Sequence, residues 1–266
     1  MSLDVGAYLD RIRWGGDTRP TFGTLAGLLR AHMLAIPFEN LDVLLGRGVR
    51  VDLEGVQEKL VRNRRGGYCF EQGTLFAAAL EAIGFEVHRH LARVTLFVPR
   101  AQAPRTHMFL TVALPEGTFV VDPGFGGLAA DVPLPIDAAP EHQPSVTHRI
   151  DKEGGGRVLR ALSDGQWVDA WFSTLEVEHP VDFEMGNHFT ATHPSSQFVN
   201  RVLLRALTPD GRVTVMNRDA TIRKNGAAPV SRTLDRPALR ALLNEHFGFD
   251  LPEVERLRVP TIPEWA

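Results

Sequence analysis

Helical periodicity dominates the first 85 residues of the chain. Between residues 24 and 34 the apolar side chains recur at the spacing of one helix face, and Pro37 is expected to end that helix. Asp52 is a typical N-cap residue, and it predicts a second helix that runs towards Arg62. This region is therefore expected to form a cluster of helices.

The strongest helical pattern covers residues 69–83, and Gly84 is expected to end it as the C′ residue. One face of this helix carries Cys69, Gly73, Phe76, Leu80 and Ile83. The sulfur of Cys69 is therefore expected at the mouth of an apolar wall. Gly73, one turn along, is expected to leave the approach to the sulfur open.

The pattern changes after residue 85 to short segments of β-branched and aromatic residues with turn residues between them. The predicted strands are 86–98, 107–114, 118–122 and 167–177. They indicate an antiparallel sheet or small barrel, punctuated by a Pro-rich stretch at 133–144. No glycine-rich phosphate-binding motif follows a strand, so neither a Rossmann nor a P-loop unit is expected.

The remainder of the chain has a mixed pattern. Residues 202–207 and 213–216 read as a hairpin, and Asp235 opens a helix that Gly248 closes. Residues 180–194 give no readable pattern. The order of helices, strands and then a mixed segment predicts an α+β protein.

Composition narrows the possible functions. The chain has 266 residues, 44% hydrophobic and 23% charged, with a net charge of -3, which does not favour nucleic-acid binding. No apolar run is long enough to span a bilayer, and residues 1–14 lack the apolar core of a secretory signal. The single cysteine excludes an internal disulfide and a cysteine zinc cluster. We therefore expect a cytoplasmic protein with no metal, nucleic-acid or membrane partner.

The residues around Cys69 favour a catalytic role for this cysteine. Gly66 and Gly67 precede it, which lets the backbone turn sharply and leaves room beside the sulfur. The unpaired N–H groups and the dipole of the first helical turn favour a thiolate over a thiol. A buried core cysteine remains the alternative reading at this point.

A cysteine nucleophile needs a base and a group that orients the base. Of the ten histidines, His107 begins a predicted strand that turns at residues 115–116 and returns to Asp122. A two-residue turn would place Asp122 opposite Phe109, with His107 as its diagonal neighbour on the same face. Spacing alone leaves open whether this is a catalytic or a structural pair.

Together these residues resemble the arylamine N-acetyltransferase family. The resemblance rests on six blocks, namely Ile36-Pro37-Phe38-Glu39-Asn40-Leu41, Arg65-Gly66-Gly67-Tyr68-Cys69-Phe70-Glu71-Gln72, Thr106-His107, Val121-Asp122 with Gly124-Phe125-Gly126-Gly127, His193-Pro194-Ser195-Ser196-Gln197-Phe198 and Thr221-Ile222-Arg223. They follow the family's order and span nearly the whole chain. The arginine, the two glycines, the aromatic residue and the cysteine, with histidine and aspartate at this spacing, are specific as a set.

The resemblance implies three domains: a helical bundle at 1–85, an antiparallel β-barrel at 86–195 and an α/β lid at 196–266. It implies a papain-like triad of Cys69, His107 and Asp122. It also implies acetyl-CoA as donor, arylamines, hydrazines or N-hydroxyarylamines as acceptors, and a role in xenobiotic metabolism.

The resemblance also assigns supporting residues. Glu39 and Arg65 match a structural ion pair near the nucleophile. The positions that match acceptor or cofactor contacts are Phe38, Thr106, Phe125, Gly126, Gly127 and Phe198. From the residues alone, the phenylalanines could equally be core and the glycine turn could serve only to bend the chain.

Two positions depart from the family pattern. Gly73 stands where asparagine is usual, and Pro123 where valine is common. Gly73 is expected to lower helix propensity by roughly 1 kcal/mol and to alter the pocket wall. Pro123 is expected to keep Asp122 extended, which suits the end of a strand. Neither is expected to disable the triad.

Three other readings remain open on the sequence. The same triad would serve a cysteine hydrolase or a transglutaminase-like enzyme. It would also serve an amide synthase that closes macrolactams. A non-catalytic binding protein on this scaffold is the third. The oligomeric state is open as well, a homo-oligomer included.

Overall fold

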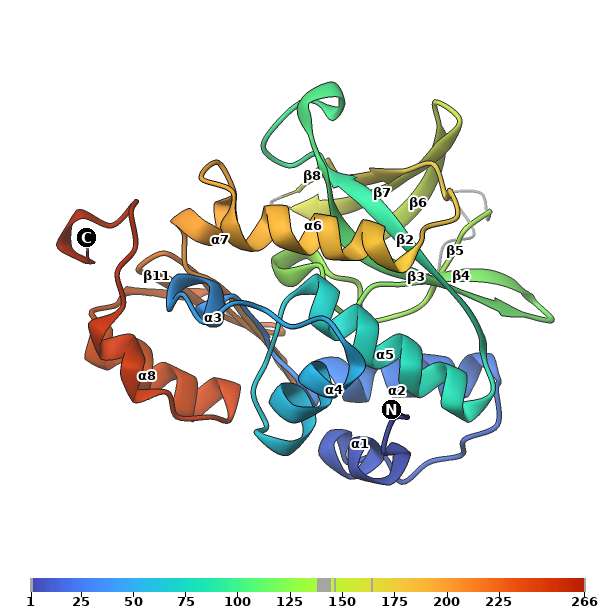
Figure 1. Ribbon diagram of the computed structural model, residues 1–266, viewed down its shortest axis with the longest axis horizontal. Helices are drawn as coiled ribbons and strands as arrows, with labels where there is room; N and C mark the ends of the chain where they lie inside the picture. Colours follow the sequence, from blue (N-terminus) through green and yellow to red (C-terminus); the bar gives the residue numbers. More distant parts are fainter. Residues whose placement is uncertain (1, 138–144, 146, 164, 266) are drawn as a thin grey trace.

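The computed structural model describes residues 2–137, 145, 147–163 and 165–265. Figure 1 shows a cluster of helices below a curved sheet. A second sheet, with its own helix, lies at the left-hand end of the molecule. In this part of the chain no helix is long and apolar enough to cross a membrane.

The N-terminal helices form where the periodicity predicts them. The Asp52 side chain accepts a hydrogen bond from Gly55 N at 3.0 Å, as an N-cap should, and Gly84 adopts φ +103° after the last helical residue. The elements are α1 (Val5–Ile12), α2 (Phe22–Ala35), β1 (Phe38–Glu39), α3 (Leu41–Leu44), α4 (Leu53–Val56), a π-turn (Gln57–Arg62) and α5 (Cys69–Ile83). Phe76 and Leu80 of α5 are fully buried in one hydrophobic cluster with residues of α1 and α2, so α5 is the central helix of this group.

Among the described residues, seven antiparallel strands form the middle sheet in the order β5-β4-β3-β2-β8-β7-β6. Their bounds are β2 (Glu86–Val94), β3 (Arg105–Leu114), β4 (Gly117–Val121), β5 (Leu134–Pro135), β6 (His148–Glu153), β7 (Gly156–Ser163) and β8 (Gln166–Ser173). The outer strands β5 and β6 contact each other, so the sheet nearly closes into a barrel. Short 3-10 turns at Arg100–Gln102 and Gly126–Leu128 interrupt its loops.

Several predicted limits are wrong in detail. The first strand ends at Val94, and the strand predicted to reach residue 177 ends at Ser173. The hairpin β6–β7 was not predicted, because β6 is charged along most of its length and buries only Ile150. The Pro-rich stretch 133–144 lies partly outside the described residues.

Residues 180–194, for which the sequence shows no periodic pattern, contain the helix α6 (Pro180–Thr192). The short helix α7 (Gln197–Asn200) follows it. Figure 1 shows α6 lying over the strands of the middle sheet and above α5, and α6 contacts β3. Its packing centres on a glycine, because a Cβ at Gly186 would come within 2.8 Å of the Phe70 ring. Tyr68 donates a hydrogen bond to Asn187 from the same side. A helix that packs through Gly and Asn shows no hydrophobic period in its sequence.

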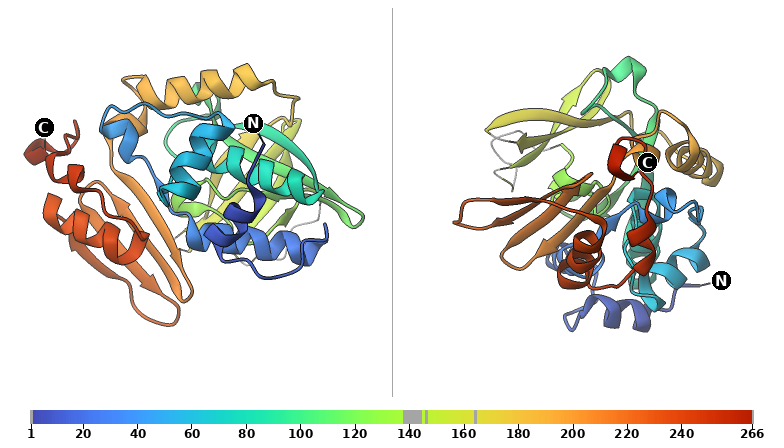
Figure 2. Two further views of the ribbon diagram at one scale, coloured as in Figure 1. Left: turned by 60° about the horizontal axis from the view of Figure 1, so that its bottom comes forward. Right: turned by 90° about the vertical axis from the view of Figure 1, so that its left-hand side faces the viewer.

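In the part of the chain that the structure describes, the second sheet combines one strand from the N-terminal region with four strands from the C-terminal region. Its order in the described residues is β1-β9-β10-β11-β12, with β9 (Leu203–Thr208), β10 (Gly211–Met216), β11 (Asp219–Lys224) and β12 (Val230–Thr233). The predicted hairpin is β9–β10. Figure 2 shows this sheet covered by α8 (Arg236–Leu242), which continues as a π-turn (Leu243–Phe247). Short 3-10 turns follow at Pro252–Arg256 and Pro263–Trp265.

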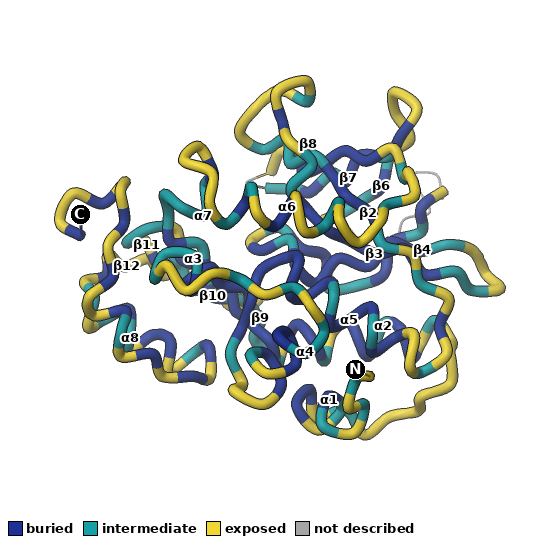
Figure 3. The backbone as a smooth tube through the Cα atoms, in the orientation of Figure 1, coloured by how far each residue is buried: buried dark blue, intermediate teal, exposed yellow. Residues whose placement is uncertain are grey.

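The pairing of β1 with β9 brings the C-terminal sheet to the N-terminal helices. Figure 3 shows that the segments around α5, β3 and β9 are buried, whereas the loops at the periphery are exposed. The division into domains at residues 85 and 195 stays a prediction. The residues that follow as a candidate site all lie at this buried junction.

Candidate active site

Cys69 is the first residue of α5 and is 2% exposed. Tyr68 precedes it in an extended conformation, and Glu71 reaches back to accept a hydrogen bond from Tyr68 N at 3.0 Å. The Sγ atom lies 3.8 Å from the carbonyl oxygen of Thr106. The cysteine is therefore held at the helix N-terminus, against the start of β3.

His107 and Asp122 come together as the hairpin register predicts. Leu114 pairs with Gly117 across the two-residue turn, and this register confirms the predicted alignment. His107 Nε2 lies 2.8 Å from Asp122 Oδ2, and both side chains are 3% exposed. Because Nε2 is engaged by the carboxylate, Nδ1 is the nitrogen left for Cys69.

The surroundings of His107 favour its charged form. Burial lowers its pKa, but the charge and hydrogen bond of Asp122, together with the Cys69 side chain, outweigh burial and raise the pKa to about 10. The ring of Phe125 meets the imidazole edge at a centroid distance of 4.9 Å. An imidazolium beside a sulfur stabilises a thiolate, and such a pair can perform nucleophilic catalysis.

Trp171 in β8 is a site residue that the sequence reasoning missed. Its Nε1 donates a hydrogen bond to Asp122 Oδ2 at 3.0 Å, and its ring stacks on Phe109 at 4.3 Å. The same carboxylate oxygen thereby contacts both His107 and Trp171. The only hint in the sequence is that a buried indole N–H needs an acceptor, which does not identify the acceptor.

The glycine-rich turn after Asp122 wraps around the nucleophile. A Cβ at Gly124 would lie 2.5 Å from the Cys69 Cα, so only glycine fits there. Gly126 has φ +71°, and a Cβ on it would touch the Phe38 ring at 3.3 Å. Apart from its two chain neighbours, no described residue has an atom within 4 Å of a Cβ built on Gly127. The turn therefore does more than bend the chain, because it packs on the cysteine.

Two of the three aromatic residues predicted around the acceptor, Phe38 and Phe198, lie together. The rings of Phe38 and Phe198 are 6.1 Å apart, and Phe198 lies 5.2 Å from the Tyr68 ring. The predicted open approach at Gly73 is not observed, because a Cβ there would sit 3.0 Å from the sulfur of Met108. Met108 therefore occupies the space that the glycine leaves.

Glu39 and Arg65 form the predicted ion pair at 2.6 Å, but within a larger network. Lys59 binds Asp42 at 2.8 Å and Glu71 at 2.7 Å, and it lies 3.7 Å from Glu39. Burial and the charge of Glu39 raise the pKa of Glu71 to about 7, although Lys59 opposes the shift. The network reaches the first turn of α5 through Glu71, and nothing in the sequence indicated its extra members Asp42, Lys59 and Glu71.

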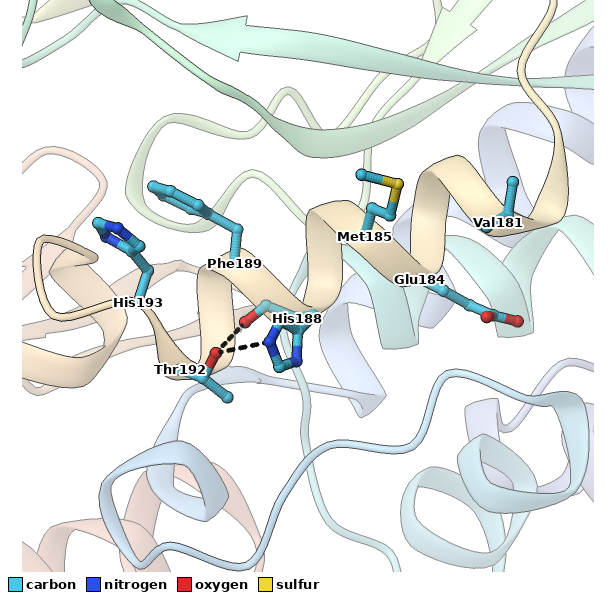
Figure 4. Close-up of a pocket in the computed structure, with 7 residues that line it drawn as sticks. All are labelled: Val181, Glu184, Met185, His188, Phe189, Thr192 and His193. Atoms are coloured by element: carbon cyan, nitrogen blue, oxygen red, sulfur yellow. Dashed lines mark hydrogen bonds between the residues drawn. The ribbon is translucent and has the colours of Figure 1, made fainter.

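A surface hollow lies along α6, away from the triad. It is lined by Val181, Glu184, Met185, His188, Phe189, Thr192 and His193. Figure 4 shows that Met185, Phe189 and His193 point to one side of the helix, whereas Thr192 Oγ1 bonds to the backbone of His188 at 2.7 Å. None of these residues belongs to the predicted site.

The sequence matches the family described as N-acetyltransferase over residues 21–256. The arylamine N-acetyltransferase of Mycolicibacterium smegmatis is 38% identical, over 96% of this chain and 94% of that protein. The arylamine N-acetyltransferase / N-hydroxyarylamine O-acetyltransferase of Salmonella typhimurium is 37% identical, over 96% and 92%. The structure of Mycobacterium marinum arylamine N-acetyltransferase in complex with CoA superposes with a TM-score of 0.88, at 34% identity over 94% of both chains.

Proposed function

Because the chain belongs to the arylamine N-acetyltransferase family and is thus an acyltransferase, we propose that it moves an acetyl group from acetyl-CoA through Cys69 to an acceptor. The acceptor is the nitrogen of an arylamine or hydrazine, or the oxygen of an N-hydroxyarylamine. The observation that carries this proposal is the buried His107–Asp122 pair beside the only thiol of the chain.

In the first half-reaction the thiolate of Cys69 attacks the thioester carbonyl of acetyl-CoA. Backbone N–H groups near the start of α5 stabilise the oxyanion. The C–S bond to CoA breaks, and His107 donates a proton to the departing CoA thiolate. The acetyl group remains on Cys69, and Asp122 holds the imidazole in place throughout.

In the second half-reaction the acceptor attacks acetyl-Cys69. Aromatic amines are weak bases, so they arrive uncharged and nucleophilic at neutral pH. His107 takes the proton that the amine loses, and the sulfur leaves as thiolate. Phe38 and Phe198, whose rings contact each other, form an aromatic cluster around the site with Phe125, whose ring contacts His107. This aromatic cluster provides flat apolar walls for the acceptor ring. Because Cys69 is 2% exposed, water reaches the thioester poorly and the intermediate waits for an amine.

CoA enters this scheme as a substrate. A relative of similar fold is described in complex with CoA, which supports this donor. Gly126, Gly127 and Thr106 line the turn and strand that contact Cys69, and we assign them to the CoA thioester end. The C-terminal segment 196–266 acts as a lid in a three-domain arrangement around this site.

The experiment that tests this proposal separates a transferase from a hydrolase. Acetyl-CoA alone should leave an acetyl-enzyme that mass spectrometry detects on Cys69, and an arylamine should discharge it. Varying both substrates should give parallel double-reciprocal lines. Cys69→Ala should remain folded and show no transfer. Acetate release at the same rate with and without an amine would favour the hydrolase reading instead.

A further inference from the structure

Arg205 is a buried arginine whose charge lacks a partner of opposite sign. It lies in β9 opposite Phe38 of β1, and it is 6% exposed. Its Nη2 donates to the carbonyl oxygen of Ala129 at 3.3 Å, whereas its Nε is buried with no hydrogen-bond partner among the described residues. No carboxylate in this part of the chain lies within 4.0 Å of its guanidinium.

The electrostatic setting of this arginine is unfavourable without an added anion. Burial and the charge of Arg212 lower the pKa of Arg205 to about 10, and the charges of Asp131 and Asp122 oppose this shift without cancelling it. Asp131 is already paired with Arg30. A buried charge is normally paired, because removing it from water costs several kcal/mol. Arg11 is also buried without a carboxylate, but its guanidinium donates to three carbonyl oxygens, whereas the Nε of Arg205 has no acceptor among the described residues.

Arg205 is also close to the proposed chemistry. Ala129, which accepts its hydrogen bond, follows the turn at Gly126–Leu128 that packs on Phe38 and leads back to Asp122. Phe38, its partner across the strands, contacts Phe198. The guanidinium therefore borders the aromatic cluster and the glycine turn at once.

We propose that Arg205 recognises an oxyanion, either a carboxylate or a phosphate, that one of the two substrates brings to the site. This rests on the acetyl-transfer function proposed above. A guanidinium offers a planar fork of donors that matches both oxyanions, and a carboxylate on an aromatic amine or a phosphate of the donor can supply the missing charge. The unpaired state of Arg205 then belongs to the free enzyme, and ligand binding neutralises it.

The test compares substrates with and without the anion in each half-reaction. For the donor, acetyl-CoA is compared with acetylpantetheine, which lacks phosphates, by the rate of Cys69 acetylation. For the acceptor, 4-aminobenzoate is compared with 4-aminobenzamide by the rate of discharge. Arg205→Gln should slow the anionic member of one pair by roughly 10- to 100-fold and change its neutral member by less than about twofold. Arg205→Lys should retain part of the preference.

A matched control is Arg218→Gln, in the turn between β10 and β11 of the same sheet, where the arginine already pairs with Glu264 at 2.7 Å. This control should leave both ratios unchanged. The arm that responds identifies the source of the oxyanion. Equal slowing of both members of each pair, or no change in either pair, would overturn the proposal while leaving acetyl transfer intact.

Two further measurements do not depend on turnover. Benzoate and inorganic diphosphate titrated by calorimetry should show binding of one of them to the wild type, weakened at least tenfold in Arg205→Gln. The same variant should unfold at an equal or higher urea concentration, because it removes an unpaired buried charge. Failure of both probes to bind, or clear destabilisation of the variant, would show a structural clamp instead. Absence of any acetyl-enzyme in the wild type would contradict the proposed function and not the oxyanion site.

Discussion

Two groups of buried charges flank Cys69, and they are organised differently. In the ion network around Lys59 each cation meets several carboxylates, since Lys59 lies within 4.0 Å of Glu39, Asp42 and Glu71, and Arg65 within 4.0 Å of Glu39 and Asp42. In the other group, His107 meets one carboxylate and keeps its second ring nitrogen for the sulfur. Redundant pairing stabilises a fold, whereas a single pair with one free nitrogen can move a proton. The difference indicates which group is structural and which is chemical.

The largest effect is expected at Asp122. We expect Asp122→Asn to lower acetyl transfer by about 10⁴-fold, because an amide favours the wrong His107 tautomer. The pKa of His107 is raised to about 10, so the pair contributes stability that is complete below about pH 6.5 and is lost as the pH rises through 10. The rate of Cys69 alkylation by iodoacetamide should stay high in mildly acidic buffer in the wild type and fall in the variant. Wild-type alkylation that follows an ordinary thiol would refute the ion pair.

The network should respond in stability more than in chemistry. We expect Lys59→Met to lower the free energy of unfolding by about 3–5 kcal/mol, because three carboxylates lose their shared cation. Arg65→Met should cost less, since Lys59 remains near Glu39. Urea melts measure both. If Arg65→Met proved the more damaging, Glu39 and Arg65 would be the isolated pair that the sequence suggests.

The local sequence predicted the candidate catalytic triad better than it predicted the residues that hold the triad in place. The helix from Cys69 to Ile83 and the His107–Asp122 register follow from periodicity and one short turn, and both match the structure. Trp171 reaches Asp122 from β8, 49 positions away in the chain, and no local pattern carries that contact. The three extra members of the ion network are likewise brought together only by tertiary packing. The open approach predicted at Gly73 is wrong for the same reason, because Met108 of β3 fills the space beside this glycine.

A further substitution, Glu71→Gln, tests the pH response of the network. Its pKa is about 7 in the folded protein and near 4.3 in an unfolded chain, so its protonated form favours folding. The sign follows: this contribution is complete below about pH 4.3 and is lost as the pH rises through 7. We expect the stability of the wild type relative to Glu71→Gln to fall by roughly 1–3 kcal/mol between pH 4 and pH 8. Urea melts at both pH values measure this. A constant difference would mean that Glu71 stays ionised.

The smallest effect is expected at Trp171. This residue gives the most direct comparison between the His107–Asp122 pair and the ion network. Trp171→Phe removes the N–H donor to Asp122 Oδ2 but keeps an aromatic ring beside Phe109. Losing one donor to a charged acceptor costs about 1.5–3 kcal/mol at most, and the remaining His107 contact reduces the loss, so we expect roughly a tenfold fall in kcat/KM. Because Asp122 would then be less well solvated as a carboxylate, the pKa of His107 should also move. The pH dependence of acetyl transfer should therefore shift together with the rate.

In the ion network the equivalent loss of one hydrogen bond, as in Glu71→Gln, should leave the pH profile of acetyl transfer unchanged. A Trp171→Phe variant with a lower rate and an unmoved profile would show that Trp171 only packs, and that Asp122 needs no second partner to hold His107.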